Sequence, residues 1–388
     1  MLNFTYHNPT KIIFGKDQIK ALNEELMPYQ NQNILLVYGK ASIKKLGIYD
    51  EIIRIAKILN ITLYEESGVR ANPELNSVLS GRKTSIENDI KFILAAGGGS
   101  VIDCAKAIAF SSTIKNEEDV WKVFLNQNKA TSALPLGVVL TLAATGSESN
   151  GNAVITNDQT NEKRIAGYPF TYPKFAIIDP VYTMSVSEHY AIAGVIDITM
   201  HVLEQYFSPT ERTETADYMS IGILKSVIEN TKRMLKDPKE YNTRANLSWA
   251  ATVGLNWILQ QGKVGDWATH RLSYPITQYF KTTHGYALTA IFPAWLKLAY
   301  KYNPEVMTWR LNLLGKELFN TEDPLKTIEA LQAYYTSLGA PTSLRDAGIT
   351  LDETTLEDML EHAMKLGNLG NVYEIDLERA KELYKLAQ

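Results

Sequence analysis

The sequence has almost no cysteine. Cys104 is the single cysteine in 388 residues, so no internal disulfide can form, and this usage is typical of a reducing compartment. No apolar run reaches the length of about 20 residues that a membrane span needs. The first residues, MLNFTYHNPTKIIFG, lack the basic region and the long apolar stretch of a signal peptide. We therefore expect a cytoplasmic protein with no membrane partner.

An excess of charge of either sign is also missing. The chain has 39 basic and 43 acidic residues and a formal net charge of −4, without a dense lysine and arginine stripe. A nucleic-acid partner is therefore not expected. Hydrophobic residues make up 45% of the chain, as in ordinary globular proteins, and the length favours two domains.

Short apolar runs recur through the first 180 residues. They are continuous rather than alternating, which is typical of strands covered on both faces. Helical patterns at 47–60 and 100–112 separate some of them, and this alternation predicts a parallel sheet. The expected strands lie at 11–15, 33–39, 61–66, 91–100, 136–141 and 175–180.

From about residue 182 the pattern becomes helical. The stretches 215–236 and 243–261 carry apolar residues at spacings of three and four, and strand-like runs become scarce. We expect an α/β dinucleotide-binding domain over 1–181 and an all-α domain over 182–388. Pro180 marks the expected hinge, because proline continues neither a strand ladder nor a helix interior.

A glycine-rich segment, FILAAGGGSVIDCAKAIA, runs from a predicted strand into a predicted helix. Gly97, Gly98 and Gly99 let the backbone approach a ligand, and Ser100 with the first helix amides can hold a phosphate. The segment is not the standard G-x-G-x-x-G motif, because Ile102 stands in place of the third glycine. A tight turn that simply needs glycine is the alternative interpretation.

The segment VYGKASIKK follows the strand at 33–39. An acidic residue at this place would bind the adenosine ribose and repel a 2′-phosphate. The chain instead has Gly39, Lys40, Ser42 and Lys44, which favours NADP over NAD. The two lysines can equally be ordinary solvated surface residues.

A third segment, LTLAATGSESNGNAVI, follows another strand end. The hydroxyls of Thr141 and Ser147 suit contacts to a diphosphate or a nicotinamide. Ordinary turn chemistry explains the same residues.

The histidines give the strongest chemical signal. In GVIDITMHVLEQY, Asp197 and His201 are four residues apart and share one face of a predicted helix. His270 and His284 follow in a second segment, where Pro275 should interrupt any single helix between them. One carboxylate and three imidazoles can ligate a divalent transition metal and leave a position open. The alternative is a plain hydrogen-bonded Asp–His pair, and we expect His7 and His362 to be surface residues.

Several segments in order carry a family resemblance. AAGGGSVIDCAKAIA, TGSESN, AIIDPVYT, GVIDITMHVLEQY and DWATHRLSYPITQYFKTTHG together resemble the iron-containing (group III) alcohol dehydrogenases. The NADPH-dependent aldehyde reductases and butanol dehydrogenases are the most similar branch. The resemblance covers nearly the whole chain. It implies a dehydroquinate synthase-like architecture, with an α/β domain followed by a helical metal-binding domain, and a homodimer.

The resemblance also implies the site residues. Asp197, His201, His270 and His284 would hold one divalent metal, Fe2+ or Zn2+, with Ni2+ as a further possibility. Relatives tend to carry an extra histidine where this chain has Tyr274, and we hypothesise that the Tyr274 hydroxyl replaces it near the substrate. The implied NADP(H) contacts are Gly39, Ser42, Gly97, Gly98, Gly99, Ser100, Asp103, Thr141, Leu142, Ser147 and Lys163.

The expected activity is hydride transfer between NADP(H) and a primary alcohol/aldehyde pair. Trp267, Tyr274, Phe280 and Leu142 could form an apolar pocket for a short unbranched aldehyde. An NAD- and zinc-dependent polyol dehydrogenase is the first alternative, and it predicts an acid near Gly39. A metal-dependent hydrolase would leave the glycine loop unused, and a non-catalytic nucleotide-binding protein would leave the four ligands unused.

Overall fold

The computed structural model describes all 388 residues, which form two compact units. The α/β unit contains His7–Ser187 and Arg233–Thr252. The helical unit contains Met1–Tyr6, Glu188–Lys232 and Val253–Gln388. Residues 233–252 thus cluster with the sheet, although the expected division places them in the helical domain.

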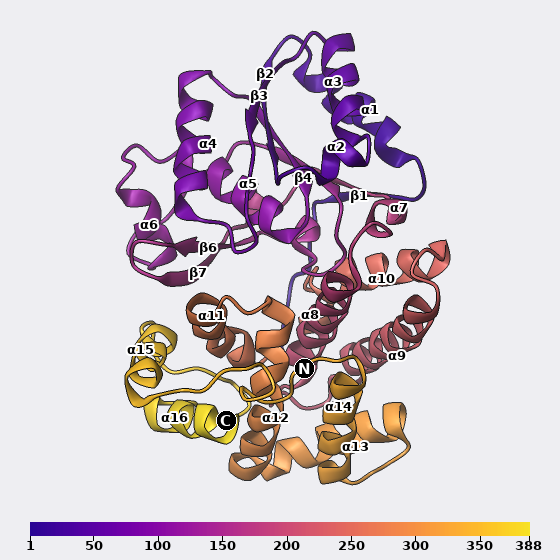
Figure 1. The fold of residues 1–388 in the computed structure, drawn as a ribbon, viewed down its shortest axis with the longest axis vertical. Helices are drawn as coiled ribbons and strands as arrows, with labels where there is room; N and C mark the ends of the chain where they lie inside the picture. Colours follow the sequence, from indigo (N-terminus) through magenta and orange to yellow (C-terminus); the bar gives the residue numbers. More distant parts are fainter. The chain divides into compact units, whose positions relative to one another are not determined.

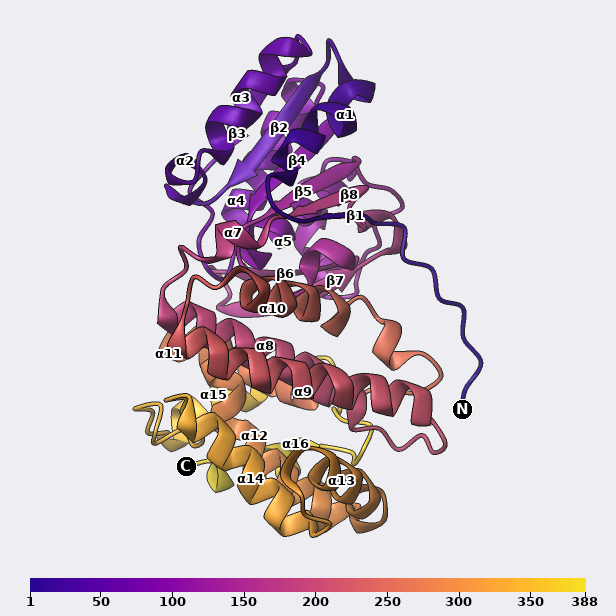
Figure 2. The same cartoon turned by 90° about the vertical axis from the view of Figure 1, so that its right-hand side faces the viewer.

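The α/β unit is built on a six-stranded sheet with the order β1-β8-β5-β4-β2-β3, in which all neighbouring strands are parallel. Figure 2 shows the strands edge to edge in this order. Each of the six predicted strands is present. They are β1 (Lys11–Phe14), β2 (Asn33–Tyr38), β3 (Thr62–Glu66), β4 (Phe92–Gly97), β5 (Leu136–Leu140) and β8 (Phe175–Ile178).

Helices cover both faces of this sheet (Figure 1). On β2, Leu35 and Val37 pack into one core, while Leu36 and Tyr38 pack into the other. Burial on both faces explains why the strands are uninterrupted apolar runs. One layer contains α4 (Leu75–Glu87), α5 (Gly99–Ser111) and α6 (Asp119–Phe124), and the other contains α1 (Leu22–Leu26), α2 (Ser42–Lys45) and α3 (Ile48–Ile58).

A small antiparallel hairpin was not predicted from the sequence. It pairs β6 (Asn152–Asn157) with β7 (Glu162–Gly167). Both strands carry many polar residues, so they lack the apolar runs that identify the strands of the main sheet. The short elements are α7 (Pro180–Thr183), η1 (Gln18–Ala21), η2 (Met27–Tyr29), η3 (Ser147–Ser149), η4 (Pro169–Thr171) and η5 (Ile258–Gln260).

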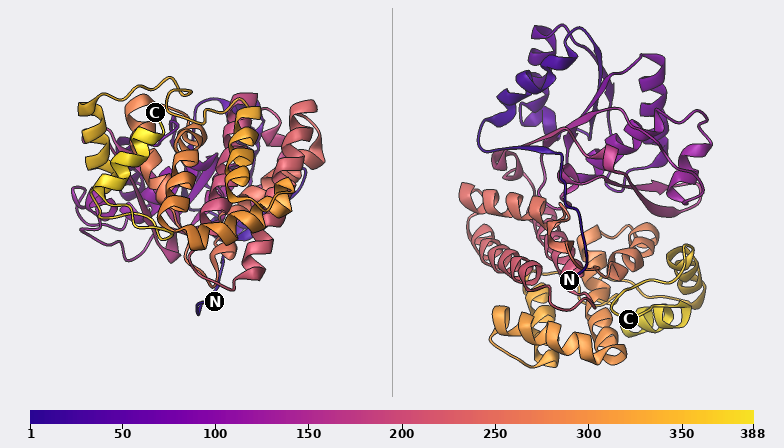
Figure 3. Two further views of the ribbon diagram at one scale, coloured as in Figure 1. Left: turned by 90° about the horizontal axis from the view of Figure 1, so that it is seen from below. Right: turned by 180° about the vertical axis from the view of Figure 1, so that it is seen from behind.

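The helical unit is arranged around α8 (Glu188–Tyr206), whose residues from Ala191 to Tyr206 are all buried. The C-terminal helices α15 and α16 lie side by side in yellow in Figure 3. The other long helices are α9 (Glu214–Lys236), α10 (Tyr241–Gly254), α11 (Ala268–Phe280), α12 (His284–Tyr302), α13 (Pro304–Phe319), α14 (Pro324–Ser337), α15 (Glu353–Met364) and α16 (Leu377–Leu386). A parallel α/β unit with a helical unit confirms the predicted fold class. Every helix is too short or too polar to cross a lipid bilayer.

Two local expectations were wrong. Helix α11 continues through Pro275 and ends at Phe280, where Lys281 adopts a left-handed backbone. Proline removes one helical hydrogen bond, but the buried residues on both sides of it keep the helix packed. His362 is buried on α15 rather than exposed, whereas His7 is exposed as expected.

A buried ion cluster fixes the segment that leads into α11. Asp217 on α9 contacts Lys263 at 2.8 Å and Arg310 on α13 at 2.5 Å, and all three side chains are almost fully buried. Arg310 also donates to the backbone oxygens of Ser208 and Thr210. Buried charges need partners, and the two cations share the carboxylate of Asp217, so this segment has a defined position against α9 and α13.

Candidate metal centre and cofactor loops

Helix α8 places three polar side chains on one buried face. Asp197, His201 and Glu204 follow the spacing i, i+4 and i+7, which repeats on one side of an α-helix. Only the first two were singled out from the sequence. Glu204 is fully buried.

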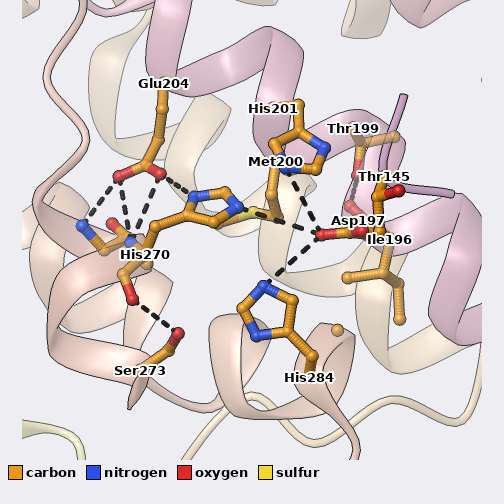
Figure 4. Close-up of polar contacts among 12 residues, drawn as sticks. Thr145, Ile196, Asp197, Thr199, Met200, His201, Glu204, His270, Ser273 and His284 are labelled. Atoms are coloured by element: carbon orange, nitrogen blue, oxygen red, sulfur yellow. Dashed lines mark hydrogen bonds and ion pairs between the residues drawn. The ribbon is translucent and has the colours of Figure 1, made fainter. Parts of the chain in front are cut away.

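Three imidazoles surround one carboxylate oxygen (Figure 4). The Nε2 atoms of His201, His270 and His284 lie 3.7, 3.8 and 3.7 Å from Asp197 Oδ1. These separations are too long for hydrogen bonds, and Oδ1 is buried without a hydrogen-bond partner. Tetrahedral ligands about 2.1 Å from one ion lie about 3.4 Å apart. Asp197, His201 and His270 therefore fit a divalent metal between them, and His284 approaches the same oxygen from another side.

The four side chains are not equivalent. The ligand atoms of Asp197, His201 and His270 lie within 4.8 Å of one another, whereas His284 is not part of this compact group. The side chain of His284 is 27% exposed, compared with 5% for Asp197. His284 thus marks the more open side of the site.

The electrostatics differ between the imidazoles. Burial lowers the pKa of His201 to about 4, so this ring is neutral at pH 7. Burial also acts against charge on His270, but Glu204 and Asp197 outweigh it and raise the pKa of His270 to about 9. Burial opposes ionisation of Asp197, yet the neighbouring imidazoles, led by His201, lower its pKa. A cation at this centre would replace a proton on His270.

Glu204 joins the metal centre to the start of α11. Its carboxylate accepts the Thr269 N–H at 2.7 Å and the His270 N–H at 3.3 Å, and it also hydrogen-bonds His270 Nδ1. It therefore caps the helix and fixes the imidazole so that Nε2 faces Asp197. The i+7 spacing from Asp197 was the signal in the sequence that could have identified this residue.

Helix α12 presents the last histidine at its first turn. His284 is the first residue of α12, and Gly285 follows it. A Cβ atom on Gly285 would lie 2.4 Å from the backbone oxygen of Ala193. Glycine thus allows α12 to approach α8 closely enough for His284 to reach Asp197.

The glycine loop lies in the α/β unit at the end of β4 and the start of α5. A Cβ atom on Gly97 would lie 2.6 Å from Val101, and one on Gly99 would lie 2.4 Å from Thr145. Close packing therefore requires these glycines. The loop lies at the carboxyl edge of the sheet, next to β2, where the strand order reverses and nucleotides bind in such folds.

Two of the predicted cofactor residues contact each other. Ser147 Oγ donates to Asp103 at 2.6 Å, and the other oxygen of this carboxylate accepts the Val154 N–H. Lys106 donates to the backbone and side-chain oxygens of Ser147. Burial raises the pKa of Asp103 and lowers that of Lys106 to about 8. The network joins α5 to the turn after β5.

The remaining predicted residues lie around the same edge of the sheet. Gly39 directly follows β2, and Ser42 is the first residue of α2. The Thr141 N–H donates to the backbone oxygen of Gly97, and Leu142 lies 3.1 Å from the position of a Cβ on Gly98. Lys163 on β7 is buried and donates to Asn72. Contacts between these residues and a cofactor stay predictions.

Comparisons with known proteins agree with this fold. Residues 9–180 match the family described as iron-containing alcohol dehydrogenase, and residues 191–388 match the C-terminal domain of the same family. Probable NADH-dependent butanol dehydrogenase 2 of Bacillus subtilis is 41% identical over 97% of each chain. NADPH-dependent aldehyde reductase YqhD of Escherichia coli is 34% identical over both full lengths. The crystal structure of NADH-dependent butanol dehydrogenase A from Thermotoga maritima has a TM-score of 0.94 and 35% identity, covering 100% of this chain and 99% of that one.

The fold and these matches together define an oxidoreductase of the alcohol dehydrogenase class. The chain belongs to the iron-containing alcohol dehydrogenase family. The expected family, and with it an alcohol dehydrogenase, is confirmed. The alternatives of a hydrolase or a non-catalytic nucleotide-binding protein find no support in these comparisons.

The contacts of Glu204 generate a prediction on metal affinity. In Glu204→Gln, an amide NH2 group replaces one carboxylate oxygen. Where this group faces His270 Nδ1 it donates a hydrogen bond to that nitrogen, which favours the imidazole tautomer with the proton on Nε2. We expect the affinity for Zn2+ to fall by about 10- to 100-fold, measured by competition with a chelating dye. Glu214→Gln, the same change at an exposed position on α9, should leave the affinity unchanged. Unaltered affinity in folded Glu204→Gln would contradict this role.

Proposed function

We propose that the protein is a metal-dependent oxidoreductase that transfers hydride between NADP(H) and a primary alcohol/aldehyde pair, and that it reduces short aliphatic aldehydes. The observation that carries the proposal is the buried Asp197 Oδ1, which has no hydrogen-bond partner and has three imidazole nitrogens 3.7–3.8 Å away. A divalent cation explains this arrangement better than hydrogen bonds do.

Asp197, His201, His270 and His284 would hold the metal. When bound, a divalent ion supplies Lewis acidity that polarises a carbonyl oxygen. The residues of the chain prepare that role: Asp197 contributes the negative charge, and Glu204 orients His270. The neutral form of His201 supplies a nitrogen lone pair. Fe2+ and Zn2+ both suit this set of nitrogen and oxygen ligands.

The cofactor proposal rests on the segment after β2. The turn of Gly39, Lys40, Ala41 and Ser42 contains no acid, and Lys44 lies 4.6 Å from the Tyr49 ring centre. A turn without a carboxylate accepts a 2′-phosphate, which favours NADP(H). The relatives have names of both kinds, NADH-dependent and NADPH-dependent, so direct comparison of the two cofactors is needed. The homodimer implied by the resemblance stays a prediction.

The first test measures NADPH oxidation and its dependence on the metal in one assay. Purified protein should oxidise NADPH in the presence of butanal, and a strong chelator should lower the rate by at least about tenfold because the Lewis acid is removed. Adding Fe2+ or Zn2+ should restore the rate, and elemental analysis identifies the metal bound. Turnover that survives complete metal removal would reject the proposal. Faster reaction with NAD and 1,3-propanediol would favour the polyol dehydrogenase instead.

Cofactor preference can be tested at Gly39. A side chain here meets only ordinary contacts, with the backbone oxygen of Val69 3.5 Å from the Cβ position. In Gly39→Asp, repulsion of the 2′-phosphate should lower the ratio of kcat/KM for NADPH to that for NADH by about tenfold or more. Gly39→Asn has the same shape without the charge and serves as the control. Equal ratios in the two variants would contradict a phosphate site at this turn.

The role of Tyr274 gives a third prediction. Its ring centre lies 6.3 Å from that of His284. If the hydroxyl delivers a proton during aldehyde reduction, Tyr274→Phe should lower kcat by about tenfold or more and change the pH–rate profile. The metal content should not change, which separates this effect from damage to the metal centre. An unchanged profile would exclude the hydroxyl from proton delivery.

A further inference from the structure

Two tryptophans beside the metal centre have an unusual backbone. Trp257 and Trp267 have φ angles of 73° and 64°, in the left-handed region. Eight of the twelve non-glycine residues with positive φ are Asn or Asp, which tolerate this conformation. For a bulky indole the conformation is unfavourable, and such strain persists where the surroundings over-determine it, often at functional sites.

The indoles lie against the metal-binding imidazoles. The Trp267 ring centre is 5.6 Å from that of His270 and 6.3 Å from that of His201. Trp257 packs on Trp267 edge to face, with the ring centres 5.5 Å apart. Both side chains are only half-buried. The pair therefore forms a rigid apolar surface beside the four side chains that converge on Asp197 Oδ1.

The position of Trp267 is fixed from several sides. Its Nε1–H donates to Gln260 Oε1 at 2.7 Å. A Cβ atom on Gly265 would lie 2.8 Å from Nε1, so glycine is needed for this geometry. The next residue, Asp266, donates its N–H to the backbone oxygen of Glu204 and accepts the N–H groups of Asn371 and Val372. The Trp267 side chain and the backbone before it are therefore both held by specific contacts.

We propose that Trp267, supported by Trp257, is a specificity-determining residue that forms the wall for the carbon chain of the substrate. This inference rests on the proposed function and names the substrate class of the same site. A flat indole without a free polar group favours an unbranched alkyl chain and offers nothing to the hydroxyls of a polyol. Its rigidity excludes branched or cyclic chains next to the carbonyl.

The test uses two truncations that separate the effect of the indole ring from the effect of the unfavourable backbone conformation. Trp267→Ala removes the indole and keeps the unfavourable backbone, whereas Trp267→Gly removes the indole and relieves it. Both variants should raise the ratio of kcat/KM for cyclohexanecarbaldehyde to that for butanal by about tenfold or more. Metal content should stay at the wild-type level. Trp249→Ala, at an exposed tryptophan of the α/β unit, should leave the ratio unchanged.

A binding measurement separates this inference from the proposed function. Titration of the metal-loaded proteins with butyramide and cyclohexanecarboxamide, which are not reduced, should show the same change of preference. If wild-type protein reduces no aldehyde, the proposed function fails. The amide titrations then still test whether Trp267 forms the wall for the carbon chain. If wild type reduces butanal but both truncations keep the wild-type ratios, the wall is rejected and the function stands. A shift in Trp267→Gly alone would assign the effect to the relieved backbone rather than to the lost indole and would also reject the wall.

Discussion

The buried carboxylate of Asp197 is the constraint on which the helical unit depends. A charge in the interior must be compensated, because its hydration is lost. Here three imidazole nitrogens approach Oδ1 without hydrogen-bonding it. Three helices must therefore keep their relative positions: α8 carries Asp197 and His201, α11 carries His270, and α12 carries His284. The close approach of α12 to α8 at Gly285 and the contact of Glu204 with His270 keep the three helices in these positions.

Glu204 shows how the fold and the chemistry share one group. Its oxygens satisfy two amides at the start of α11, which would otherwise lack partners in a buried setting. The same oxygens determine which nitrogen of His270 faces the centre. A second carboxylate, Asp266, accepts the N–H groups of Asn371 and Val372 and so ties the C-terminal segment to the same helix end. Burial raises the pKa of Asp266 to about 6, although the hydrogen bonds from these backbone N–H groups act in the opposite direction.

The sequence predicted the elements whose signal is local. The six strands were recognisable because burial on both faces makes them continuous apolar runs, and the i, i+4 pair of Asp197 and His201 was recognisable from helical spacing alone. The hairpin β6–β7 was missed, since many of its residues are polar and it lacks the apolar runs of the main sheet. The i+7 spacing places Glu204 on the same helix face as Asp197, but its partner, His270, is far away in the sequence, so the role of Glu204 was missed. The predicted helix break at Pro275 was wrong, because tertiary packing stabilises a helix that the local preference of proline would end.

Several of the predicted cofactor residues also have a structural role that the sequence did not indicate. The three glycines predict a phosphate loop. Two of them, Gly97 and Gly99, are required in any case, because a Cβ atom there would clash with Val101 or Thr145. Asp103, for which the resemblance implies a cofactor contact, also accepts hydrogen bonds from Ser147 and the Val154 amide. This carboxylate couples α5 to the turn after β5, so two of the predicted cofactor segments are joined by one buried network.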